Sequence, residues 1–183
     1  MTRRFLLACA LVPVFASHAS ADCPVGPDFA PQIDALVAQL QVAPDEQAAR
    51  GLAAQMWEIW LDAPDALAQS MLDEGMALLR MGDMGASRAA LTELIAYCGA
   101  YAEGYNQRAF AAFLSGDYEA ALVDLDRAID LRPQHLGALT GKALTLIEMG
   151  RGDEAQEVLR RALDINPWLA ERALLEGPLE RDI

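Results

Sequence analysis

Few side chains in this sequence could take part in catalysis or hold a metal, and they are scattered. Histidine occurs at His18 and His135, and cysteine at Cys9, Cys23 and Cys98. His135 lies just after a proline in an expected turn, and a lone histidine in a turn is typical of a surface residue rather than a general base. The histidines and cysteines also lack the short spacings of metal ligands. We therefore expect no catalytic residue, no metal and no cofactor.

Acidic residues are abundant, but none stands out as one of a catalytic pair. The chain has 27 aspartate and glutamate residues against 14 lysine and arginine residues, and a formal net charge of -13. This charge repels the phosphates of nucleic acids, so we expect no nucleic-acid partner. The acidic row Asp124, Asp126 and Asp130 has helical spacing and is typical of a solvated helix face.

Residues 1–21 have the pattern of an export signal. Arg3 and Arg4 supply positive charge, residues 5–16 are apolar, and small residues around position 20 provide a cleavage site. We expect cleavage after Ala21, with cleavage after Ala19 as an alternative. The apolar run is shorter than the roughly 20 residues that span a bilayer, which argues against a retained anchor. The sequence thus predicts a periplasmic protein without stable membrane insertion.

Two segments, residues 102–135 and 136–169, are copies of one another with a period of about 34 residues. The identical pairs are Ala109/Ala143, Gly116/Gly150, Ala121/Ala155, Leu125/Leu159, Arg127/Arg161, Ala128/Ala162, Asp130/Asp164 and Pro133/Pro167. A repeat of this length predicts a solenoid of stacked helix pairs.

Weaker periodicity extends the repeat in both directions. Residues 68–101 keep the same register and predict a third, degenerate copy. Residues 22–67 predict an N-terminal arm and a helical hairpin, and residues 170–183 a C-terminal cap and tail. Trp57 and Trp60 share one side of the hairpin's second helix, and we expect them to anchor it against the first repeat. A platform for stacking a ligand is the alternative.

Cys23 and Cys98 are the cysteines that remain after cleavage of the signal. An even pair in an exported protein predicts one disulfide, which would join the N-terminal arm to a junction between repeats. The alternative is two free thiols, with Cys98 packed in the core.

The residues shared by the copies resemble the tetratricopeptide repeat. In residues 102–135 the family's small residues, turn glycine, aromatic and terminal proline correspond to Ala109, Ala121, Ala128, Gly116, Tyr118 and Pro133. The whole chain resembles small exported proteins of Gram-negative bacteria that carry this repeat. The resemblance implies an all-α, right-handed superhelix of antiparallel helix pairs, with an N-terminal helical hairpin and a C-terminal capping helix.

The resemblance also implies a concave groove lined by the first helix of each pair. Carried over by position, the groove would contain Leu72, Asp73, Met76, Leu79, Asn106, Gln107, Phe110, Phe113, Thr140, Leu144 and Ile147. Asn106 and Gln107 could bond a peptide backbone or simply be solvated, and Phe110 and Phe113 could line the groove or the core. A specialised relative grips carboxylates with basic residues and asparagine, but those positions hold Leu72, Met76, Gln107, Gly137 and Gly141 here.

These observations favour a non-catalytic monomer that binds a peptide or protein of the cell envelope. One alternative is a structural protein that associates with itself through exposed apolar ends. Another is a hydrolase without a recognisable motif.

Overall fold

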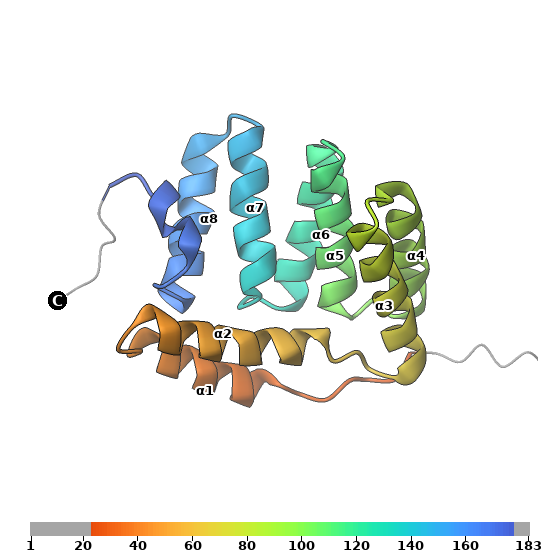
Figure 1. Ribbon diagram of the computed structural model, residues 1–183, viewed down its shortest axis with the longest axis horizontal. Helices are drawn as coiled ribbons and strands as arrows, with labels where there is room; N and C mark the ends of the chain where they lie inside the picture. The colour runs from red at the N-terminus through yellow and green to blue at the C-terminus, as the bar shows by residue number, and fades with distance from the viewer. Residues whose placement is uncertain (1–22, 178–183) are drawn as a thin grey trace, which may run out of the picture.

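Eight α-helices and one short 3-10 helix make up the part of the chain that the structure, a computed structural model, describes, residues 23–177 (Figure 1). Within these residues there is no β-strand, so the predicted all-α class is confirmed. The expected signal, residues 1–21, lies outside them. No described helix is both long and apolar enough to cross a bilayer. The elements are α1 (Ala30–Gln41), α2 (Glu46–Leu61), α3 (Ala66–Arg80), α4 (Met84–Tyr97), α5 (Ala102–Leu114), α6 (Tyr118–Leu131), α7 (Leu136–Glu148), α8 (Gly152–Ile165) and η1 (Ala170–Leu174).

Helices α3 to α8 form three stacked pairs, one pair for each copy of the repeat (Figure 1). The turns within the pairs contain Gly82, Gly116 and Gly150 with φ of 81°, 74° and 71°, a region that favours glycine. Side-chain oxygens of Asp83 and Asp117 then accept backbone N–H bonds at the start of α4 and α6. The repeated glycines therefore fix the antiparallel turn, including the turn of the degenerate copy.

The two helices of the degenerate repeat cross closely at small residues. Gly75 occupies the place that Ala109 has in the next copy, and a Cβ there would lie 2.6 Å from the Cγ of Leu91. Ser87, in the place of Ala121, is buried, and its hydroxyl donates a hydrogen bond to the Gly75 carbonyl at 2.8 Å. The substitutions thus keep the tight helix crossing rather than lose it.

At the junction between the first two repeats, one side chain is larger than its equivalent at the next junction, and the residue facing it is smaller. Leu94 replaces the small residue found at Ala128, while Gly104 replaces Ala138. A Cβ on Gly104 would lie 3.3 Å from the Cδ2 of Leu94, so the leucine fills the space that the glycine leaves.

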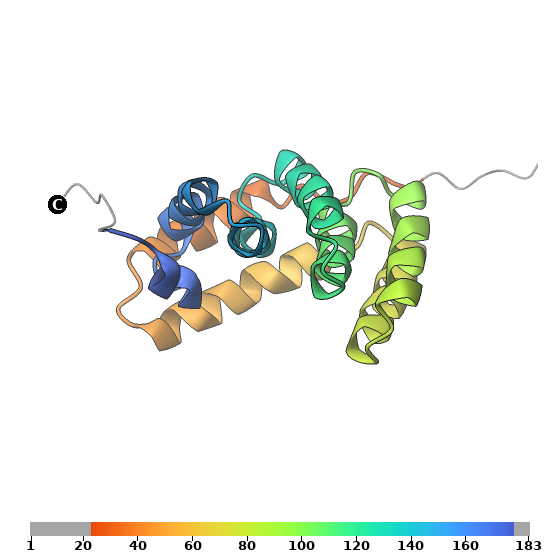
Figure 2. The same ribbon diagram turned by 90° about the horizontal axis from the view of Figure 1, so that it is seen from above.

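The N-terminal hairpin runs beneath the repeats rather than capping the first one (Figures 1 and 2). Seen from above, α2 extends from beside η1 toward α3. At the far end, Gln41 donates to the carbonyl of Asp164 at 3.1 Å, and Glu46 pairs with Arg172 at 3.1 Å. Trp60 does contact the first repeat, since its carbonyl accepts a hydrogen bond from Tyr101, but the tryptophan rings pack farther along, on His135 and beside Gly137.

The physical reason for this path is the apolar face of the hairpin. Its buried residues, such as Leu40 and Met56, share a cluster with Leu136 of α7, and Ile165 and Trp168 pack against that cluster. The residues that cover the apolar face of the hairpin belong to the last repeat. The hairpin must therefore pass under the whole solenoid to reach them.

The predicted disulfide is present between Cys23 and Cys98, whose Cα atoms are 5.2 Å apart. Cys98 lies at the end of α4 and is buried. The bond attaches the start of the N-terminal arm to the first repeat. Because the hairpin is bonded at the other end to Asp164 and Arg172, the N-terminal segment is held at both ends of the solenoid.

The C-terminal cap is shorter than expected. After α8 the chain forms the five-residue 3-10 helix η1, which has no buried residue. The side chain of Gln156 holds it by donating to the Leu174 carbonyl and accepting from the Glu176 N–H. Leu169 and Leu175, which flank η1, pack against the core of the last two repeats.

One residue of the acidic row is not solvated. Asp124 is buried, and both of its carboxylate oxygens accept hydrogen bonds of 2.7 Å from the guanidinium of Arg108. These bonds raise the pKa of Arg108 above its ordinary value. The expectation of a solvated row is wrong at this position, because Asp124 faces α5 rather than solvent.

Candidate functional site

The first helices of the three pairs line a groove with a volume of about 470 Å³. Its walls are Trp57, Met76, Leu79, Arg80, Asn106, Gln107, Ala109, Phe110, Phe113, Leu125, Gly137, Thr140, Gly141, Leu144 and Thr145. Most of these residues are apolar, so the groove can remove apolar side chains of a ligand from water.

An apolar row crosses the groove from one repeat to the next. Met76, Phe110 and Leu144 occupy the same position of successive repeats, on α3, α5 and α7. The side chain of Phe110 is 50% exposed, which is unusual for a phenylalanine in a folded chain. Phe113 is partly buried, with its ring centroid 5.6 Å from that of Tyr118, and also reaches the groove. Both phenylalanines therefore line the groove.

Three of the predicted groove residues do not line it. Leu72 is completely buried in a cluster with Leu91 and Leu94, so its expected place in the groove is wrong. Asp73 is exposed and accepts a hydrogen bond from Gln69. Ile147 is 36% exposed but lies outside the groove wall. The structure brings together the other predicted residues: Met76, Leu79, Asn106, Gln107, Phe110, Phe113, Thr140 and Leu144.

The two amides of the groove are held by a buried carboxylate. Glu103, in the first turn of α5, is 1% exposed. Its carboxylate accepts from the Asn106 Nδ2 at 3.2 and 3.3 Å and from the Gln107 Nε2. Both amide side chains are buried as well, so they are ordered rather than solvated.

His135 completes this network, and its hydrogen bonds select one tautomer of the ring. Its Nδ1 accepts the backbone N–H of Ala138 at 3.2 Å and so caps α7. Because Nδ1 is an acceptor, Nε2 carries the hydrogen, and Nε2 lies 2.8 Å from the Glu103 Oε2. The ring also stacks on Trp60, with centroids 4.5 Å apart.

His135 is thus fully buried, and the expectation of a surface turn residue is wrong. Its capping role, unlike its burial, has a local signal in the sequence that was overlooked. The connection before α7 contains no serine, threonine, aspartate or asparagine to cap the helix, so the adjacent histidine takes that role.

Trp57 also lines the groove, although it was not among the groove positions predicted from the repeat register. It comes from the hairpin, packs edge-on against Trp60 with centroids 6.2 Å apart, and lies close to Gly137 at the start of α7. A Cβ on Gly137 would be 3.0 Å from the Trp57 ring. Trp57 therefore closes the groove at the end of the inner helices that faces the hairpin.

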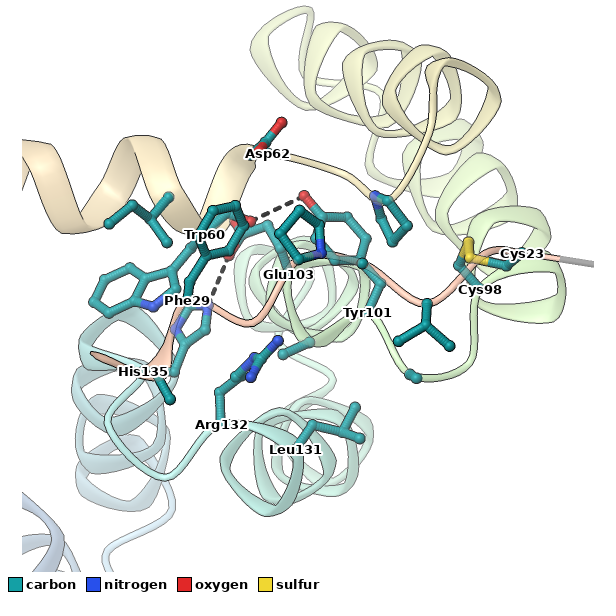
Figure 3. Close-up of a pocket in the computed structure, with 18 of the residues that line it drawn as sticks. Cys23, Phe29, Trp60, Asp62, Cys98, Tyr101, Glu103, Leu131, Arg132 and His135 are labelled. Carbon is teal, nitrogen blue, oxygen red and sulfur yellow. Dashed lines mark hydrogen bonds and ion pairs between the residues drawn. A yellow bond between two sulfur atoms is a disulfide. The ribbon is translucent and has the colours of Figure 1, made fainter. Parts of the chain in front are cut away.

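A second pocket of about 500 Å³ lies on the other side of the Glu103 network, between the N-terminal arm and the repeat junctions (Figure 3). Phe29, Trp60, Tyr101 and Arg132 are among its walls. The Tyr101 hydroxyl donates to the Trp60 carbonyl at 2.9 Å, and burial raises the Tyr101 pKa, with a further increase from the charge of Glu103.

Among the described residues, no cluster of three or more histidine, cysteine, aspartate or glutamate side chains could hold a metal ion. The buried Glu103 and His135 bond to each other and to helix and amide groups, which is a structural arrangement.

A family model described as a tetratricopeptide repeat matches residues 112–175. The chain carries tetratricopeptide repeats. A repeat-containing protein of Rhizobium etli is 29% identical over 136 residues, covering 74% of this chain and 67% of that relative. Tetratricopeptide repeat protein 36 of Xenopus tropicalis is 31% identical over 112 residues, and the match spans 55% of its length.

Solved tetratricopeptide repeat structures share the fold. The first such domain of Spaghetti (RPAP3), bound to the HSP90 peptide SRMEEVD, superposes with a TM-score of 0.57 at 18% identity, over 58% of this chain and 85% of that one. MamA superposes with a TM-score of 0.53 at 21% identity, over 72% of this chain and 74% of that one. These likenesses confirm the tetratricopeptide repeat solenoid.

Proposed function

We propose that this chain is a non-catalytic adaptor that binds a segment of another protein in the groove of α3, α5 and α7. The observation that carries the proposal is the row Met76, Phe110 and Leu144, which presents apolar side chains across all three repeats. Phe110 at its centre is 50% exposed, so its ring is available to a ligand. A concave apolar row of this kind is suited to the side chains of a bound peptide.

Other proteins of this fold support the peptide as a ligand class. The Spaghetti domain holds an HSP90 peptide, and the TPR2B domain of yeast Sti1 is in complex with a pHsp70 peptide. At the positions where a specialised relative of the family grips a carboxylate, this chain has Leu72, Met76, Gln107, Gly137 and Gly141, none of which is basic. We therefore expect a different partner, one recognised through apolar contacts.

We further propose that the adaptor acts in the periplasm of a Gram-negative bacterium. The signal pattern of residues 1–21 and the disulfide between Cys23 and Cys98 are both typical of an exported protein. N-terminal sequencing of the protein recovered from the periplasm tests this: a start at Asp22 is expected, a start at Ser20 is the alternative, and an intact Met1 in the cytoplasm contradicts it.

Photo-crosslinking in cells that naturally produce the chain tests the groove. A benzophenone amino acid replaces Phe110 in one variant and Val123 in another. Val123 is 69% exposed on α6, outside the groove, and serves as the matched control. We expect a heterologous protein adduct from position 110 that is absent from position 123.

The products distinguish the alternatives. An adduct of the chain with itself at position 110 supports self-association instead, and equal adducts at both positions contradict a groove-specific partner. Light scattering after chromatography checks the same point, because the adaptor is expected to be monomeric at all concentrations.

A further inference from the structure

The polar side chains in the middle of the groove have used their hydrogen-bond donors within the chain. The Thr140 hydroxyl donates to the Leu136 carbonyl at 2.9 Å, and the Thr145 hydroxyl donates to the Gly141 carbonyl at 2.7 Å. Each hydroxyl oxygen keeps lone pairs that can still accept a hydrogen bond.

The buried Glu103 carboxylate likewise engages the hydrogen-bond donors of the two groove amides. Glu103 can only accept, so the NH₂ groups of Asn106 and Gln107 must point toward it. Their carbonyl oxygens, Oδ1 and Oε1, receive no donor from any described residue. No buried side-chain oxygen of the described residues lacks a partner, so these two unpartnered oxygens are accessible, and as parts of the groove wall they can accept from a ligand.

The donors of the groove wall lie at its ends. Arg80 is the last residue of α3, and Trp57 closes the opposite end beside Gly137. Between them, Asn106, Gln107 and Thr140 present acceptors next to the exposed ring of Phe110.

We propose that the groove selects partner segments that place an arginine or lysine side chain beside an apolar residue. This inference rests on the adaptor function proposed above and specifies the partner's chemistry. Bonds from a charged donor to a carbonyl are stronger than neutral ones, and the Glu103 carboxylate behind the amides favours a cation. The net charge of -13 attracts basic segments over longer distances. A ligand carboxylate at the same place would face only lone pairs.

Selection from a random peptide library displayed on phage tests the preference. The full mature chain is the bait, and binders that also bind Phe110→Ala are removed. We expect the remaining sequences to be enriched in arginine or lysine next to leucine, phenylalanine or methionine. Enrichment of acidic or uncharged sequences overturns the inference but leaves the adaptor function standing, whereas failure to recover any groove-dependent peptide contradicts both.

Chemical analogues of one selected peptide separate charge from hydrogen bonding. The basic residue is replaced by citrulline, which keeps N–H donors without charge, by norleucine, which has neither, and by glutamate. We expect affinity to fall in that order, by about tenfold or more for norleucine, since a hydrogen bond to a charged group is lost. Norleucine binding as tightly as arginine contradicts the proposal.

A variant of the protein tests the acceptor directly. In Gln107→Lys the ammonium can still donate to Glu103, but the carbonyl acceptor is gone and a positive charge is added. We expect the arginine peptide to lose about tenfold or more in affinity and the norleucine peptide to change little. Gln39→Lys, an exposed substitution on α1 outside the groove, makes the same change of charge and is the control. An equal loss in both variants shows a general charge effect and contradicts a specific acceptor.

Discussion

The carboxylate of Glu103 and the imidazole of His135 meet at 2.8 Å with both side chains fully buried. Glu103 begins the inner helix of the second repeat, and His135 caps the inner helix of the third. Trp60 of the hairpin stacks on the same imidazole. One buried contact therefore joins two repeats and the hairpin, and it also orients the groove amides.

Replacement of His135 by alanine is expected to destabilise the fold by about 3 kcal/mol. The variant loses a helix cap, the stacking on Trp60 and one donor to the buried Glu103 carboxylate. Chemical denaturation followed by circular dichroism measures the change. His135→Asn retains a capping acceptor and should lose less than the alanine variant. A loss below about 1 kcal/mol for His135→Ala contradicts the structural role.

Two glycine-to-alanine substitutions are expected to have opposite effects. Gly51 lies within α2 with no neighbour within 4 Å of an added Cβ, so alanine should stabilise the protein by about 0.5–1 kcal/mol. A Cβ on Gly75 would collide with Leu91, and Gly75→Ala should destabilise by about 1–3 kcal/mol despite its better helix propensity. Thermal unfolding of both variants checks this, and stabilisation by Gly75→Ala would show that the helix crossing is loose.

The disulfide is expected to stabilise the fold by a few kcal/mol, with about 4–5 kcal/mol as the upper end of the chain-entropy model for so long a loop. Reduction of the wild type and the Cys23→Ser/Cys98→Ser variant should lower the unfolding midpoint to a similar extent. The intact mass after alkylation without reductant should show no modified thiol. Two alkylated thiols in the native protein would contradict the bond.

Acid stability depends on Asp65, which caps α3. The backbone N–H of Ala68, followed by the hydroxyl of Tyr97, lowers the pKa of this carboxyl. A lowered folded-state pKa gives stability above the unfolded-state value of about 4, and this stability is lost as pH falls through the folded-state value. The free energy of unfolding measured between pH 5 and 2 should therefore fall less steeply in Asp65→Asn than in the wild type.

Tyr97→Phe provides the companion test, because it removes one donor to Asp65 and leaves the cap in place. Its free energy of unfolding should fall less steeply with pH than that of the wild type, because the folded-state pKa of Asp65 then lies closer to the unfolded-state value. Identical pH profiles for all three proteins would mean that Asp65 does not contribute.

Local features and the disulfide between Cys23 and Cys98 were predictable from the sequence, whereas the path of the N-terminal hairpin was not. Gly116 and Gly150 mark turns because the required backbone conformation depends on the residue itself. The register also placed Met76, Phe110 and Leu144 on one surface, since equivalent positions of a repeat face the same way.

The burial of His135 and the position of Trp57 depend on where the hairpin packs. No short-range pattern specifies that path, because the apolar face of the hairpin could have covered either end of the solenoid. Leu72 shows the same limit: its repeat position lines the groove at Asn106 and Thr140, but in the first repeat the side chain turns into an apolar cluster.

The most direct test of the account is the affinity of the crosslinked partner segment for three forms of the protein. Truncation of a central apolar contact should weaken binding about tenfold or more, so Phe110→Ala should raise the Kd by at least that factor. Val123→Ala, on the outer helix α6, should change it less than about twofold. Equal affinity of the wild type and Phe110→Ala for that segment would show that the partner does not bind in the groove.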